Sequence, residues 1–196
     1  VFDDGALTAI RDVAFSNTGL WQGLVRRHNN VAVTSGTIAI AGQSHPIAAD
    51  ASFFFRGLLP GTYNATASIS HPLGTGLQGN LAVVITAGQV TTGTLLIEPT
   101  GGARGRVLNA DGSIVVAVQV RLQRSSFSRA LNTDTAGQYE FQDVPAGTYS
   151  VRATDPATGL EVSQTVVVVQ DQTATVADLA FAPKGTVQVE ARLPRG

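Results

Sequence analysis

The chain has 196 residues, a formal net charge of −1 at pH 7, and neither cysteine nor methionine. Its balanced charge argues against a nucleic-acid-binding surface or an anionic membrane as partner, and no apolar run approaches the roughly 20 residues that a membrane helix needs. The lack of cysteine excludes disulfides, cysteine zinc sites and thiol nucleophiles. Because no methionine is encoded, we expect a fragment or a processed chain.

The first residues resemble the end of a repeated block. Residues 12–15 are similar to 94–97 and to 178–181, and a glycine follows each block a few positions later. We therefore expect residues 1–16 to be the C-terminal strands of a preceding repeat. The three glycines that open the next segment are Gly19, Gly101 and Gly185.

Two full repeats are expected next. The segment 53–67 aligns with 139–153, and the tripeptide Gly-Thr-Tyr is identical in both. The alignment predicts one β-sandwich repeat over 17–98 and a second over 99–183. Repeats of this length are large enough to bury a core of their own. Residues 184–196 are then the first strand of a following repeat.

Apolar and polar residues alternate with period two in both repeats, as in 118–122, and this pattern predicts strands. Turn residues separate the strands, above all the pair Asp111-Gly112 and the Asn pair at 29–30. The apolar run 165–169 predicts a central strand covered on both faces, or a strand that changes sheets. Short strands with frequent turns indicate an all-β sandwich or barrel.

Four motifs of the second repeat resemble the carboxypeptidase regulatory-like domain: residues 105–112, 118–120, 133–141 and 144–151. The resemblance covers 99–183 well. It covers 17–98 more weakly, because the Asp-x-x-Gly turn before the aromatic strand is reduced to Ala-Asp-Ala-Ser at 49–52.

This resemblance implies an all-β fold of tandem seven-stranded Greek-key β-sandwiches, of transthyretin-like or immunoglobulin-like type. Related sandwiches include the collagen-adhesin B-type repeats of bacterial surface proteins. The family implies non-catalytic modules, often in series, in secreted or cell-surface proteins. It supplies no catalytic residues to transfer.

Several motif residues are expected to be structural. Pro145 should preset a turn and Gly147 should supply a permissive backbone after it. Tyr149 and Tyr63 should pack their rings inward while their hydroxyls reach nearby backbone. The full set of turn and core residues is Gly61, Tyr63, Asp111, Gly112, Pro145, Gly147 and Tyr149, and the aromatic core is expected to contain Phe53, Phe55, Tyr139 and Phe141.

The sequence points to no catalytic, cofactor or metal site. Residues 74–79 match the dinucleotide-binding pattern Gly-x-Gly-x-x-Gly, but the following residues read as a strand and not as the helix that holds a phosphate, so we expect a loop. The three histidines, His28, His45 and His71, are expected in turns or precede proline. The single lysine, Lys184, excludes an internal isopeptide bond from the first repeat.

Three residues are candidates for contact with a partner: Phe54, Trp21 and His71. Phe54 aligns with polar Glu140, so alternation should turn it away from the core. Trp21 aligns with the apolar Ala103, which favours burial, and an exposed or interface role stays open. Binding loops are expected at 43–50 and 71–80.

These observations favour a non-catalytic tandem module that acts as a stalk or spacer in a large bacterial protein, extracellular or at the cell surface. One alternative is an adhesive module that binds a protein or a carbohydrate through its end loops. Another is a fibre subunit that exchanges strands through unpaired edges. The expected partners are neighbouring repeats of the same chain or fibre, or a surface protein or glycan. We expect no enzyme, no cofactor, no nucleic acid and no membrane insertion.

Overall fold

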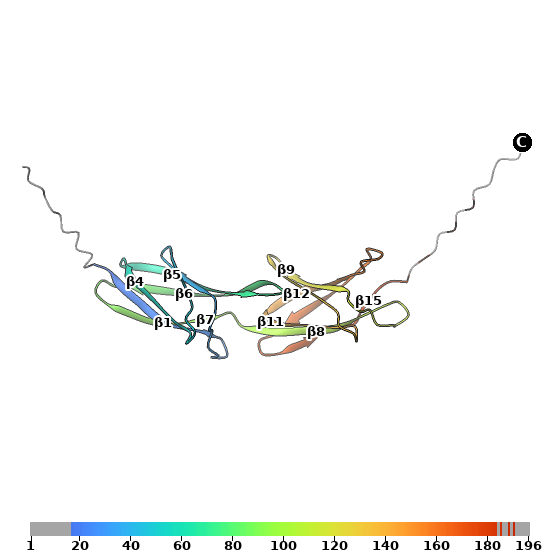
Figure 1. The fold of residues 1–196 in the computed structure, drawn as a ribbon, viewed down its shortest axis with the longest axis horizontal. Helices are drawn as coiled ribbons and strands as arrows, with labels where there is room; N and C mark the ends of the chain where they lie inside the picture. The colour runs from blue at the N-terminus through green and yellow to red at the C-terminus, as the bar shows by residue number, and fades with distance from the viewer. Residues whose placement is uncertain (1–16, 184, 186–187, 189, 191–196) are drawn as a thin grey trace, which may run out of the picture. The chain divides into compact units, whose positions relative to one another are not determined.

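The structure is a computed structural model that describes residues 17–183, 185, 188 and 190. Every regular element in this part of the chain is a β-strand (Figure 1). No described helix is long and apolar enough to cross a membrane. The expected strands in 1–16 and 184–196 lie outside the described residues, apart from positions 185, 188 and 190, which are not in strands.

The described chain divides into two compact units. Unit 1 consists of residues 17–69 and 78–97, and unit 2 consists of 70–77 and the chain from residue 98 onward. The segment 70–77 therefore groups with unit 2, although the repeat pattern assigned it to the first repeat.

Unit 1 contains seven strands in two sheets, with orders β4-β1-β7 and β6-β5-β2-β3. β1 is antiparallel to β4 and parallel to β7. The strands are β1 (Gly19–Arg27), β2 (Thr37–Ile40), β3 (Gln43–Pro46), β4 (Ser52–Leu58), β5 (Gly61–His71), β6 (Gly74–Ile85) and β7 (Val90–Ile97).

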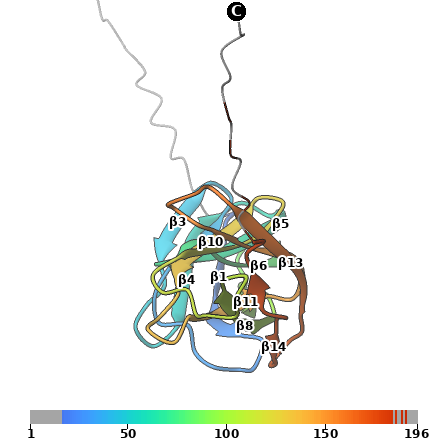
Figure 2. The ribbon, with the colours of Figure 1, turned by 90° about the vertical axis from the view of Figure 1, so that its right-hand side faces the viewer.

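Unit 2 also has two sheets, with orders β11-β8-β14 and β13-β12-β9-β10. The short β15 pairs with the end of β8, and both β14 and β15 run parallel to it. The strands β8, β11 and β14 gather in the end-on view (Figure 2). The strands are β8 (Thr100–Leu108), β9 (Gln119–Arg124), β10 (Phe127–Asn132), β11 (Gln138–Pro145), β12 (Gly147–Thr154), β13 (Glu161–Val168), β14 (Thr173–Thr175) and β15 (Leu179–Ala180).

The two units share one topology. Counted from the first strand of each unit, strands four, one and seven form one sheet, and strands six, five, two and three form the other. Along the chain, the connections between the two sheets therefore occur after the corresponding strands in both units. This agreement supports the repeat, which remains a prediction from the sequence.

Each unit buries apolar side chains from both of its sheets, so each is a β-sandwich. In unit 1 the core includes Trp21 and Phe55 from one sheet and Ile38 from the other, each with no exposed surface. In unit 2, Phe141 from one sheet and Leu122 from the other also have no exposed surface. Each such side chain contributes roughly 1.5–3 kcal/mol by leaving water. The all-β sandwich fold expected from the alternating pattern is confirmed.

Three local predictions were wrong. Residues 43–46 form β3, and residues 74–80 belong to β6, so neither expected binding loop has the predicted form. The apolar run 165–169 lies in and after β13, an edge strand, with Val167 57% exposed. Composition alone does not separate an edge strand from a central one, because strand order is set by contacts between distant segments.

Candidate functional site

The expected tyrosine contacts are present in both units. Tyr149 begins the core face of β12, and its hydroxyl donates to the carbonyl oxygen of Pro145 at 2.7 Å. Tyr63 in β5 donates to the carbonyl of Leu59 at 3.0 Å, also four residues upstream. Burial raises the pKa of Tyr149, which keeps the hydroxyl protonated as a donor. Each tyrosine therefore ties the start of its strand to the preceding turn.

The residues around this tyrosine in unit 2 have specific neighbours. Pro145 is the last residue of β11, paired with Thr100, and only Ala146 lies between β11 and β12. Gly147 has φ +149°, and a Cβ there would collide with the Arg124 guanidinium. That guanidinium donates to the Ala146 carbonyl and covers the Tyr149 ring at 4.7 Å. A side chain at Gly147 would displace this cation.

The expected turn at Asp111 and Gly112 follows β8. The Asp111 carboxylate accepts hydrogen bonds from the backbone N–H and the hydroxyl of Ser113. These bonds lower the pKa of Asp111, since they favour its charged form. Gly61 opens β5, and a Cβ added to it would lie 3.5 Å from the nearest atoms of the Tyr63 side chain, which is ordinary contact.

A contact role for Trp21 is corrected, because the side chain has no exposed surface. Its ring lies 4.3 Å from the Phe53 ring and 5.7 Å from the Phe55 ring, measured between centroids. β1 alternates, and Trp21 falls on the face that packs into unit 1. Its place in the alignment with Ala103 was the correct signal.

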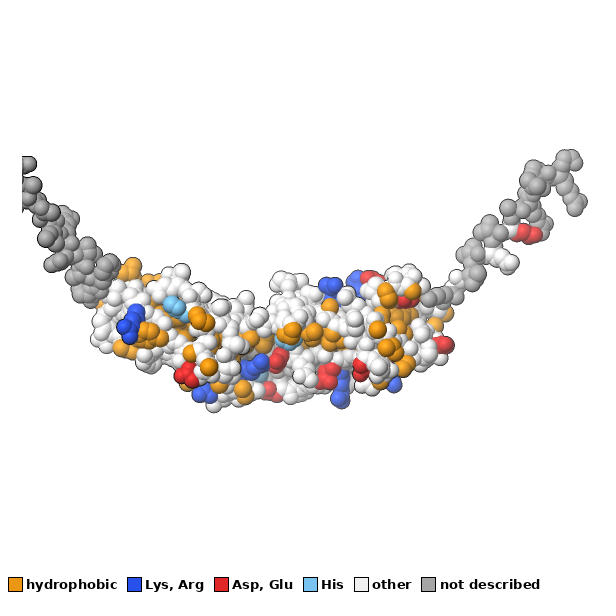
Figure 3. All heavy atoms as spheres, viewed as in Figure 1, with side chains coloured by type: hydrophobic (Ala, Val, Ile, Leu, Met, Phe, Trp, Pro, Cys, Tyr) orange, Lys and Arg blue, Asp and Glu red, His pale blue; other side chains and the backbone are white. Residues whose placement is uncertain are grey.

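Phe54 points outward, as alternation predicted, and is 39% exposed. The Arg56 guanidinium lies 4.4 Å from its ring centroid. Across β1, Gln22 pairs with Phe54, and Leu20 pairs with Val90 of β7. The outer face of the sheet β4-β1-β7 thus mixes exposed apolar and polar side chains. Figure 3 shows the same mixture of side-chain types over the side of the described chain that faces the viewer.

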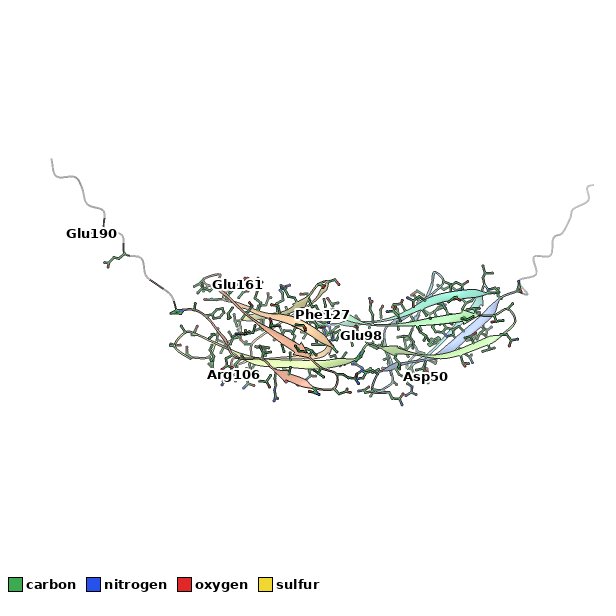
Figure 4. The ribbon with its side chains drawn as sticks, turned by 180° about the vertical axis from the view of Figure 1, so that it is seen from behind. Asp50, Glu98, Arg106, Phe127, Glu161 and Glu190 are labelled. Carbon is green, nitrogen blue, oxygen red and sulfur yellow. The ribbon has the colours of Figure 1, made fainter. Side chains whose placement is uncertain are left out.

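The corresponding face of unit 2 is charged. Arg104 lies opposite Glu140 in the register of β8 and β11. Arg106 (labelled in Figure 4) makes an ion pair with Asp178 at 2.8 Å, and both side chains are exposed. The Asp178 carboxylate raises the pKa of the guanidinium. On this outer face, unit 1 therefore has an exposed phenylalanine, Phe54, at the position where unit 2 has Glu140.

The third contact candidate, His71, ends β5 and belongs to unit 2. Its Nδ1 accepts the backbone N–H of Leu73 at 3.2 Å, so it closes the turn between β5 and β6. Within the described residues, no three His, Asp or Glu side chains lie close enough to hold a metal ion. The residues 74–79 lie in β6, and a strand does not offer the helix N-terminus that a dinucleotide needs.

Unit 2 contains a cavity of about 510 Å³, lined by β8, β11, β14 and the end of β10. Tyr139 lines it, and the Tyr139 hydroxyl is buried without a hydrogen-bond partner among the described residues. Burial, and then the charge of Asp178, raise the pKa of this hydroxyl. Around the cavity, Arg106 forms an ion pair with Asp178, the Asp134 carboxylate accepts backbone N–H groups of a turn, and the Glu140 carboxylate accepts from the Gln142 amide. These contacts favour a structural over a catalytic role.

Sequence reasoning did not identify Arg129, which is 1% exposed in β10. The sequence did contain a signal for this residue. In the alternation of β10, Arg129 falls on the same face as the apolar Phe127 and Leu131. A cation on such a face requires several acceptors nearby.

Comparisons with solved structures agree with this fold. A streptococcal ancillary pilin superposes with a TM-score of 0.51 at 10% identity, over 86% of this chain and 64% of the pilin chain. The chain thus spans less than two thirds of that pilin. The minor pilin GBS52 of Streptococcus agalactiae also gives a TM-score of 0.51, at 12% identity, over 88% of this chain and all of the pilin chain. At these identities the similarity shows the fold alone.

No curated protein matches the chain. A family model does match part of it, the carboxypeptidase regulatory-like domain over residues 102–182, which include most of unit 2. This match confirms, for residues 102–182, the resemblance to the carboxypeptidase regulatory-like domain that the sequence motifs indicated.

Proposed function

We propose that this chain is a non-catalytic, tension-bearing spacer of a secreted or cell-surface protein, with its two units acting in series. The pairing of the first and last strands of unit 1 carries the proposal. β1 runs parallel to β7 through eight residue pairs, from Leu20 with Val90 to Arg27 with Ile97. The chain enters at the start of β1 and leaves at the end of β7. Tension between these points therefore loads the hydrogen bonds together in shear.

Two further observations support a spacer. Only Glu98 and Pro99 separate β7 from β8, and proline restricts the backbone of so short a connection. The family match is to a regulatory-like domain, and the pilins with the same fold are proteins of surface fibres by name. Both favour a non-catalytic module of a surface protein or a fibre, with similar modules as its neighbours.

Single-molecule pulling with two attachment geometries tests the proposal. The chain has no cysteine, so introduced cysteines are unique handles. Handles at Asn17→Cys and Glu98→Cys load β1 against β7 in shear. Handles at Asn17→Cys and Gln89→Cys hold the same ends of both strands and peel them apart one bond at a time. We expect unit 1 to unfold at a force several times higher in shear, since forced unfolding is governed by the unfolding barrier.

The peeling variant is the matched control, because it has the same fold and the same number of introduced handles. Equal unfolding forces in the two geometries would contradict a load-bearing role for the β1–β7 pairing. A chain that unfolds in shear at forces as low as those in peeling would be a poor spacer under tension.

The outer face of unit 1 favours a second candidate, an adhesive contact. Phe54 lies where unit 2 has the charged Glu140, and Leu20 and Val90 lie on the same face of the sheet. An exposed aromatic group on a sheet can serve as a contact residue. This face differs from the expected end loops at 43–50 and 71–80, which lie largely in β3 and β6.

Binding of the labelled chain to arrays of immobilised glycans and extracellular-matrix proteins tests the adhesive candidate. We expect Phe54→Ser to remove the strongest signals, because the variant deletes the exposed ring. Val167→Ser, at an exposed position of unit 2, is the control and should keep them. Absence of wild-type binding, or equal binding by the Phe54 variant, would eliminate the adhesive candidate.

A further inference from the structure

Residues 70–77 make strand-like contacts along the outer edge of β10, within unit 2. The Ala130 N–H donates to the carbonyl of Leu73 at 3.0 Å, and the Ser128 N–H donates to Thr75 Oγ1 at 3.0 Å. Gly74 pairs with Arg129 in antiparallel register. The Leu73 side chain also packs against the apolar core of unit 2. The segment thus accepts hydrogen bonds from N–H groups on an edge of β10 that water would otherwise contact.

Arg129 links this segment to β11. Its Nε donates to the Thr75 carbonyl at 2.9 Å, and its Nη1 donates to the carbonyls of Gln142 at 2.8 Å and Asp143 at 2.9 Å. The pairing of β11 with β8 is irregular between Phe141 and Val144, and Asp143 has φ +54°. This bulge brings two consecutive carbonyls to one nitrogen.

The cost of burying a cation explains why these acceptors matter. A guanidinium that is 1% exposed needs acceptors for its donors, and three backbone carbonyls from two separate segments accept from its Nε and Nη1. The Phe127 ring (Figure 4) adds a contact, with its centroid 5.0 Å from the guanidinium carbon. Removal of residues 70–77 would leave one of these donors without its acceptor and would open the site to water.

The approach of the segment to β10 is close enough to require glycine. A Cβ on Gly74 would lie 2.4 Å from the carbonyl oxygen of Ser128, and the φ of Gly74 is +135°. Any side chain at this position must push the two backbones apart. The fit between this segment and β10 is therefore sterically specific.

Unit 1 has no equivalent site on β3, the strand in the corresponding place. The hairpins β2–β3 and β9–β10 both turn through two residues, which places His45 at the position of Arg129 and Pro46 at that of Ala130. Pro46 has no N–H to donate where Ala130 binds the segment, and His45 is exposed. The edge of β3 is therefore protected against the same kind of pairing.

We propose that the outer edge of β10, together with Arg129, is an acceptor site for the tip of a β-hairpin, and that residues 70–77 occupy it as an integral part of unit 2. A unit that begins at residue 98 or 99 is then incomplete without this tip. The proposal is independent of the spacer function, since it concerns which segment completes the fold of unit 2.

Hydrogen exchange in the full chain tests the proposal. In the wild type we expect the Ala130 amide to exchange about 100-fold more slowly than the amide of Ser44, which lies on the outer edge of β3. Gly74→Ala should accelerate exchange at Ala130 and Ser128 by about tenfold or more, while amides paired between β9 and β12 keep their rates. Gly42→Ala is the control, since Gly42 also has a positive φ but no atom within 4 Å of its Cβ position.

Two results would overturn the proposal: an unprotected Ala130 amide in the wild type, or unchanged exchange at Ala130 in the Gly74 variant. Arg129→Met provides a second test, because it keeps the length of the side chain and removes every donor. It should raise the Ala130 exchange rate by a similar factor, and Arg129→Lys should not restore protection, because an ammonium cannot span the three carbonyls. Slow Ala130 exchange in a folded Arg129→Met chain would refute the role of the arginine in the site.

Discussion

At the scale of single residues, the three tyrosines show that a hydroxyl stabilises a fold when it has an acceptor and destabilises it when it is buried without one. Tyr149 and Tyr63 each donate to a carbonyl four residues upstream. The Tyr139 hydroxyl is also buried but finds no partner among the described residues. Phe53 occupies the aligned position in unit 1, so an aromatic ring without the hydroxyl suits the same site.

The two buried tyrosines of unit 2 therefore give opposite predictions on loss of the hydroxyl. Tyr149→Phe should lower the free energy of unfolding by about 1–2 kcal/mol, because the Pro145 carbonyl loses its buried donor. Tyr139→Phe should leave the free energy of unfolding unchanged or increase it, because an unpaired polar group is removed. Urea denaturation followed by circular dichroism measures both.

Tyr63→Phe is the matched control, since the hydrogen bond of its hydroxyl is exposed and water can replace the lost bond. A loss for Tyr139→Phe as large as that for Tyr149→Phe would show that a water molecule in the adjacent cavity binds the Tyr139 hydroxyl.

At the scale of elements, the turns that precede β4 and β11 have one geometry in spite of different sequences. Ala51 has φ +67° and Gly137 has φ +68°, and each donates its N–H to the residue three positions upstream. Asp50 and Asp134 both accept a backbone N–H two residues downstream, although they occupy different positions of the turn. The weaker motif at 49–52 therefore still forms the turn, and buried Ala51 takes the place of glycine.

Gly137→Ala tests what this turn requires. We expect the free energy of unfolding of unit 2 to fall by about 1–2 kcal/mol, from the left-handed backbone and from crowding. The new Cβ would lie 3.1 Å from the Ile114 Cβ and 3.2 Å from the Val107 carbonyl oxygen. Gly159→Ala is the control, because Gly159 has φ +69° and open space, so it should incur the backbone cost alone. Equal losses in the two variants would show that crowding contributes nothing.

At the scale of the whole chain, the two units differ in how their terminal strands are paired. In unit 1, β1 and β7 share eight consecutive parallel pairs. In unit 2, β8 shares three pairs with β14 and two more with β15, in separate segments. Under tension on both ends of the chain, unit 2 should therefore yield before unit 1, and the same pulling experiment measures that order.

The sequence by itself determined the fold class, the positions of several turns and the identity of most core residues. It could do so because period-two alternation and turn chemistry are local properties, visible in Trp21, Phe55 and the pair Asp111-Gly112. The tyrosine contacts were also predictable, since donor and acceptor lie four residues apart.

Only the tertiary structure decided which strands lie at edges, which segment completes unit 2 and why Arg129 is tolerated inside it. The strand β13 ends in an apolar run yet lies at an edge, and residues 70–77 leave the unit in which their sequence neighbours pack. The acceptors of Arg129 come from positions 75, 142 and 143, and no local pattern brings them together. Such contacts depend on chain segments that meet only after the sheets have formed, so their energies are absent from any short stretch of sequence.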